Sequence, residues 1–210
     1  VPENDKTAVM WYTKAAEQGN AAAQSNLGGM YSNGQGVPEN DKTAVMWYTK
    51  AAEQGDAGAQ SHLAWMYKRG DGVQQDYKTA VMWSTKAAEQ GDVYAQFNLG
   101  IMYDSDGALV PVRDSDVQSD DKAAMIWYSK AAVQGLAIAQ YRLGLMYDSG
   151  RAGEEDDTTA VMWYIKAAEQ GSVDAQNQLG FKYAYGNGVP ENDDKAVMWY
   201  TKAAEQGNVY

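Results

Sequence analysis

The sequence predicts an all-α solenoid of about five to six helix-turn-helix repeats, each 36 residues long. The 210 residues include 7 Trp and 15 Tyr but only 2 Phe, which is typical of one short segment copied several times. Six of the tryptophans open nearly identical phrases, spaced by 36 residues except for one interval of 44. Between them, apolar residues recur with the period of α-helices. The six are Trp11, Trp47, Trp83, Trp127, Trp163 and Trp199.

The first helix of each repeat, which we call helix A, is expected over about residues 5–18. Ala8, Trp11 and Ala15 share one apolar arc of that helix. Gly19 follows where a helix end favours a residue able to adopt positive φ. The pattern recurs six times and predicts six A helices.

The second helix, helix B, is expected over about residues 20–33. Asn20 is suited to be its N-cap, and Gly34 to end it. Asp or Ser takes the Asn20 position in most other repeats, but Leu136 takes it in the fourth. We therefore predict five B helices, of which the fourth is capped less well.

The repeated pattern A-x-x-W-Y-x-K-A-A-x-Q-G-x-x-x-A-Q-x-x-L-G-x-M-Y-x-x-G-x-G-V resembles the Sel1-like repeat family over essentially the whole chain. The resemblance implies one array over residues 1–210, a right-handed α/α superhelix related in shape to tetratricopeptide arrays. The tetratricopeptide period of 34 makes that family the second choice. Ser84, in place of Tyr, and Lys182, in place of Met, depart from the pattern.

The resemblance also implies a function. Bacterial Sel1-like proteins act as non-enzymatic scaffolds or adaptors that bind a protein partner along the superhelical surface. Inhibition of a toxin, as by an immunity protein, and host interaction are among the roles it suggests. The alternative is an enzyme, or a binder of cell-wall fragments, in the concave groove. Self-assembly of the array is a third hypothesis.

Composition excludes several other functions. There is no cysteine for a disulfide or thiolate site, and His62 is the single histidine, so we expect no metal, cofactor or catalytic triad. A net charge of −11 argues against a nucleic-acid partner. No apolar run is long enough to predict a membrane span.

Helix B carries one variable row that suits partner binding. Large apolar residues occupy its centre in four repeats, where the first repeat has Gly29. Such a row predicts binding hot spots, but packing against the neighbouring B helix is the alternative, and we favour it. The candidates along and beside the row are Trp65, Tyr94, Phe97, Ile101, Tyr141, Leu145, Phe181 and Tyr185.

Helix A carries a second, nearly uniform face. Its Met row begins at Met10 and suits either an adaptable protein contact or packing between adjacent A helices. Its Lys row begins at Lys14 and suits either an acidic partner or the helix dipole, of which we favour the dipole.

An acidic insert at about residues 104–119 interrupts the repeat. The stretch from Asp104 to Asp121 carries −5 of the total charge of −11. We expect it to attract a basic partner, with a solvated, flexible loop as the alternative. The candidate residues are Asp104, Asp106, Asp114 and Asp116.

The chain begins within a copy of the inter-repeat turn and ends just inside the next expected helix B. It lacks an initiator Met, so we expect a fragment or mature portion of a longer protein. The sequence leaves the compartment open and favours a periplasmic or secreted location over the cytoplasm. An uncapped end is also suited to homodimer formation.

Overall fold

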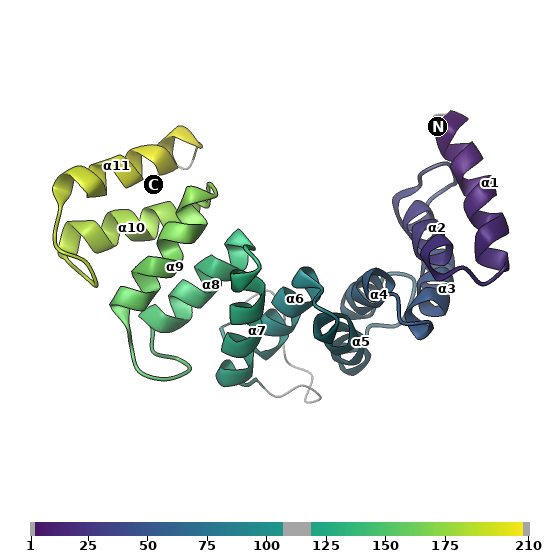
Figure 1. Cartoon of the computed structure of the whole chain (residues 1–210), viewed down its shortest axis with the longest axis horizontal. Helices are drawn as coiled ribbons and strands as arrows, with labels where there is room; N and C mark the ends of the chain where they lie inside the picture. The colour runs from purple at the N-terminus through teal and green to yellow at the C-terminus, as the bar shows by residue number, and fades with distance from the viewer. Residues whose placement is uncertain (1–2, 107–118, 208–210) are drawn as a thin grey trace. The chain divides into compact units, whose positions relative to one another are not determined.

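The computed structural model describes residues 3–106 and 119–207, and it confirms the all-α class (Figure 1). Eleven α-helices and no strand lie within these residues. The A helices are α1 (Glu3–Glu17), α3 (Asp41–Glu53), α5 (Tyr77–Glu89), α7 (Asp121–Val133), α9 (Asp157–Glu169) and α11 (Asp193–Glu205). The B helices are α2 (Ala21–Asn33), α4 (Ala57–Arg69), α6 (Val93–Tyr103), α8 (Ala137–Asp148) and α10 (Val173–Tyr185).

The described residues form two compact units, 3–99 in the first and 100–106 with 119–207 in the second. Within each unit a helix packs mainly on its neighbours in the sequence. The closest pairs join helix B to the following helix A, as in α2 with α3 and α10 with α11. This consecutive packing is the arrangement of an α/α solenoid.

Short turns join helix A to helix B. Gly19 adopts φ 89° after α1, a conformation that disfavours any side chain. The Asn20 side chain then accepts a hydrogen bond from the backbone N–H of Ala23 at 2.8 Å. Leu136 makes no such bond at the start of α8, which confirms the weak cap predicted there.

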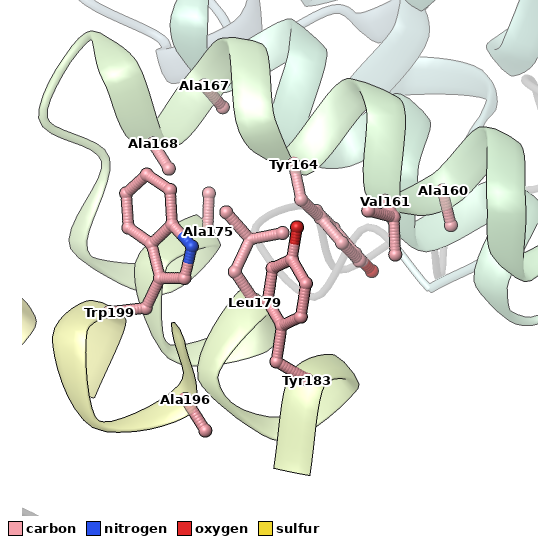
Figure 2. Close-up of a cluster of buried hydrophobic side chains, with 10 residues drawn as sticks. All are labelled: Ala160, Val161, Tyr164, Ala167, Ala168, Ala175, Leu179, Tyr183, Ala196 and Trp199. Atoms are coloured by element: carbon pink, nitrogen blue, oxygen red, sulfur yellow. The ribbon is translucent and has the colours of Figure 1, made fainter. Parts of the chain in front are cut away.

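In three A helices the tryptophan is buried against the helix pair that precedes it, as Trp47, Trp83 and Trp199 show, while Trp127 and Trp163 are partly buried. Trp47 of α3 joins Ala16, Ala23 and Leu27 in one apolar cluster. Figure 2 shows the same arrangement around Trp199, whose indole lies beside Ala168 and Leu179. In contrast, 60% of Trp11 is exposed, because no preceding pair covers α1.

A glycine in helix B makes room for the tyrosine of the next helix A. A Cβ placed on Gly28 would lie 2.8 Å from the Tyr48 ring, which is closer than van der Waals contact allows. The third, fourth and fifth repeats repeat this pair. In the second repeat both members differ: Ala64 takes the position of the glycine and the buried Ser84 that of the tyrosine. The departure at Ser84 is therefore one half of a paired change.

A buried glutamine in helix B links three helices. Gln24 donates a hydrogen bond to the carbonyl oxygen of Ala16, at the end of α1, at 3.0 Å. It also accepts one from Gln54, at the end of α3, at 2.6 Å. The pairs Gln60–Gln90, Gln140–Gln170 and Gln176–Gln206 repeat the second contact at 2.8 to 2.9 Å. We call this series the glutamine ladder.

Candidate functional site

The outer face of the A helices is the most regular exposed surface. A methionine or isoleucine on each A helix keeps more than two fifths of its area exposed. This row is Met10, Met46, Met82, Ile126, Met162 and Met198. Adjacent A helices therefore leave a large part of each of these side chains exposed.

The lysine row has a partner that the sequence interpretation missed. In every A helix the ammonium group lies 4.1 to 4.7 Å from the centre of the tryptophan ring three residues earlier, as in Lys130 over Trp127. A cation over an indole face is attracted by the ring quadrupole. The i, i+3 spacing was visible in the sequence and signals this contact.

One helix of this face, α7, differs from the others. Val133 stands where the other A helices carry an exposed glutamate, and 77% of Val133 is exposed. Ile126 replaces methionine and is 57% exposed. Lys122 and Lys130 lie on the same face, and neither ammonium group forms an ion pair within the part of the chain that the structure describes. The face of α7 is therefore apolar and basic, without a carboxylate.

A groove of about 470 Å³ opens on this face of α7. Met125 and Ile126 form its apolar side, while Tyr147 and Ala152 line it from the end of α8 and the following turn. Ala152 replaces a glycine found in other repeats. Gly36 is the equivalent glycine of the first repeat, and a Cβ on it would lie 2.5 Å from the carbonyl oxygen of Asp5 in helix A. A turn with alanine at this position therefore cannot approach its A helix as closely as a turn with glycine. We call this site the α7 groove.

The acidic insert begins with a buried carboxylate. Asp104 is 3% exposed and accepts hydrogen bonds from the Tyr128 hydroxyl at 3.0 Å and from Arg151 at 2.6 Å. Arg151 also lies 3.4 Å from Asp106 and 4.0 Å from Asp121. The prediction of Asp104 as a partner-binding residue is therefore wrong, because internal partners occupy it. Asp106 is exposed, and Asp114 and Asp116 lie outside the described residues.

The next repeat contains an equivalent network. Lys182 is buried and pairs with Asp148 and Asp157, and Asp148 accepts a hydrogen bond from the Tyr164 hydroxyl at 3.0 Å. Burial alone would lower the pKa of Lys182, but these hydrogen bonds raise it above its usual value. The same bond from Lys182 lowers the pKa of Asp157. This network explains why Lys182 replaces the methionine of the other repeats.

The variable row of helix B does not form one surface. Ile101 is 6% exposed, so the prediction of Ile101 as a surface contact is wrong, because packing covers it. Leu145 and Tyr141 are partly buried and pack against the core of Figure 2. Phe97 is also partly buried. The exposed members are Trp65, Tyr94, Phe181 and Tyr185.

Residues 3–106 and 119–207 contain no helix long and apolar enough to cross a membrane. The same residues contain no group of three or more His, Asp or Glu placed to hold a metal ion.

Fold and repeat together define a repeat protein of the α/α-solenoid class. The Sel1 repeat model matches six consecutive segments, 1–20, 21–56, 57–92, 93–136, 137–172 and 173–208. The chain therefore belongs to the Sel1 repeat family, whose fold is a scaffold for protein interaction and is generally non-enzymatic. Comparison with curated proteins gives no significant match.

Solved structures agree with this assignment. A Sel1 repeat protein from Oxalobacter formigenes is 38% identical with a TM-score of 0.82, over 91% of this chain and 76% of that one. The antigen c5321 from uropathogenic Escherichia coli is 39% identical with a TM-score of 0.56, over 99% of this chain and 51% of that one. Immunity protein Pa5087 from Pseudomonas aeruginosa, at 21% identity and a TM-score of 0.53 over 94% and 72%, shares the fold alone.

Proposed function

We propose that this protein is a non-enzymatic scaffold that binds a protein partner through the outer face of its A helices. The α7 groove is the observation that supports this best. It joins the exposed apolar surface of Ile126 to Lys122 and Lys130, and Val133 is exposed on the same helix. Such an apolar centre with a polar margin is typical of binding surfaces.

The chemistry of the groove selects the partner segment. An apolar side chain would fill the space beside Met125 and Ile126, and a carboxylate next to it would meet Lys122 or Lys130. The partner segment on α7 is therefore apolar and acidic. The basic partner expected from the insert has less support, because Asp104 is buried and Arg151 offsets one of the three charges of Asp104, Asp106 and Asp121.

A peptide library displayed on phage tests the proposal without knowledge of the natural partner. Selection on the full chain should enrich peptides that combine a bulky apolar residue with Asp or Glu. Ile126→Glu should abolish their binding, since it places a carboxylate at the centre of the groove. Met46→Glu, the same change on α3 in the first unit, is the matched control and should leave binding intact.

Two outcomes would contradict this function. Enrichment of basic peptides would favour the acidic insert as the docking element. Equal binding of the peptides by the Ile126→Glu and Met46→Glu proteins would exclude α7 as the binding site. A role as an inhibitor of a toxin or in host interaction would use the same kind of surface, and identifying the partner by cross-linking at position 126 would distinguish these roles.

A further inference from the structure

The first repeat contains a pocket beside a glycine of helix α2. Gly29 occupies the centre of the variable row on α2, where the next repeats carry Trp65, Ile101, Leu145 and Phe181. A pocket of about 320 Å³ lies beside Gly29. We attribute the space to the missing side chain and call it the amide pocket.

The most buried residue that lines the amide pocket is Tyr48, which carries a hydroxyl group. Tyr48 is 3% exposed, and its oxygen would lie 3.4 Å from a Cβ on Gly29. The corresponding tyrosines, Tyr128 and Tyr164, donate their hydroxyls to carboxylates. The first repeat has Ser32 at that position, and among the described residues the Tyr48 hydroxyl has no hydrogen-bond partner. Tyr48 lines the pocket, so its hydroxyl is available to donate a hydrogen bond to a ligand there.

The rest of the lining is polar and uncharged. Asn26, Asn33 and Gln35 contribute side-chain amides. The Asn33 amide nitrogen donates to the Gly29 carbonyl at 2.9 Å, which leaves its oxygen to accept from a ligand. The pocket thus offers donors and acceptors together but no ionised group.

Aromatic rings define the remaining walls. His62 stacks on Tyr48 with the ring centres 5.0 Å apart and the planes 21° apart, which fixes the position of the hydroxyl. Burial lowers the pKa of His62, partly offset by Asp92 and Asp56, which favours the neutral form of the ring. Tyr12 is 36% exposed and lines the same pocket.

We propose that the amide pocket binds an uncharged saccharide ring. Vicinal hydroxyls both donate and accept, so they match the side-chain amides and the Tyr48 hydroxyl. The C–H face of a sugar ring is apolar and suits contact with an aromatic ring such as Tyr12. A charged ligand would lose its hydration without gaining a counter-ion. The site is separate from the α7 groove and does not depend on the proposed function.

Ligand-observed NMR with the full chain tests the proposal. The probes are glucose, galactose, mannose and N-acetylglucosamine with their neutral disaccharides, and glucuronate and glucosamine as charged counterparts. We expect saturation transfer to at least one neutral sugar and weaker transfer to the charged ones. Gly29→Leu, which copies Leu145, should remove binding by filling the pocket, and helix α2 tolerates leucine well.

Two more variants separate binding from folding. Tyr48→Phe removes one hydroxyl and should weaken binding by about 2- to 12-fold, the range for loss of one hydrogen bond. Phe181→Leu changes the equivalent row position in the fifth repeat and should leave binding unchanged. The proposal is overturned if no neutral sugar binds, if Gly29→Leu binds as wild type does, or if a capped asparagine diamide binds in preference to every sugar.

Discussion

The pairing of helix-B glycine with helix-A tyrosine predicts a strong coupling between positions 64 and 84. Ser84→Tyr would direct a ring at the Ala64 methyl group. In the other repeats a Cβ at the glycine position would lie 2.4 to 2.8 Å from the tyrosine ring, as at Gly28 and Gly100. Overpacking of this kind costs about 1 to 3 kcal/mol. We therefore expect Ser84→Tyr alone to destabilise the protein by that amount.

The second change removes the clash. Ala64→Gly alone should cost about 1 kcal/mol, from the lower helix propensity of glycine. In the double variant the tyrosine ring fits, and it also replaces the Ser84 hydroxyl, a buried oxygen with no hydrogen-bond partner in the described structure. The double variant should therefore be at least as stable as the Ser84→Tyr protein, with a coupling energy of about 1 to 3 kcal/mol.

Urea unfolding followed by circular dichroism measures the four proteins of this cycle. For a chain of this size, each kcal/mol also shifts the melting temperature by about 2 to 4 °C. The mirror cycle, Gly144→Ala with Tyr164→Ser, provides the control in the fourth repeat. Additive effects in both cycles would refute the steric argument.

Three further predictions concern the second unit. Lys182→Met should destabilise it by about 2 to 3 kcal/mol. This is less than the about 3 to 5 kcal/mol for a fully buried pair, because Asp148 and Asp157 keep 21% and 32% of their side-chain area exposed. Adding Asp148→Ser, which copies the first repeat, should recover most of this stability in denaturant unfolding, and no recovery would contradict the charge argument. The wild-type contribution of Asp157, whose pKa is lowered, is present above the unfolded value of about 3.9 and is lost as the pH falls through the lower folded value. The difference in unfolding free energy between wild type and Lys182→Met should therefore stay constant from pH 7 to about pH 4 and narrow below that, and a difference that stays constant below pH 4 would exclude Asp157 as its source. Leu136→Asn should stabilise α8 by about 0.5 to 2 kcal/mol, because it supplies the missing N-cap. Hydrogen exchange measures this, and Ser172→Ala, which removes the cap of α10, is the control with the opposite expected effect. Unchanged exchange in α8 would count against the cap.

The fold was predictable because the same pattern of residues occurs six times along the chain. Trp spacing fixed the repeat length, and the glycine and cap positions placed the helix ends within a few residues. The weak cap at Leu136 followed from one side chain. These are local signals, and each depends on a residue's own backbone or its near neighbours.

The candidate site was less predictable, because exposure depends on which helix covers a residue. Ile101 and Trp65 occupy the same row, yet one is buried and the other is 43% exposed. Asp104 looked like part of a charged surface because its partner, Arg151, lies 47 residues away in the sequence. The α7 groove depends on Ala152, which lines it. Ala152 differs from the usual glycine by one methyl group, and the sequence pattern alone does not show that this difference opens a groove.

The glutamine ladder has a consequence for how such arrays change length. Its bonds tie the ends of successive A helices to the start of the helix B between them, so one extra residue in the short turn at Gly19 would break two contacts at once. The turns from helix B to the next helix A carry no part of the ladder. Extra sequence at those turns leaves the ladder intact, and this chain has its eight additional residues there, between α6 and α7. Loops grafted at the other B-to-A turns should be accepted in the same way, which makes that edge the natural place to diversify the protein.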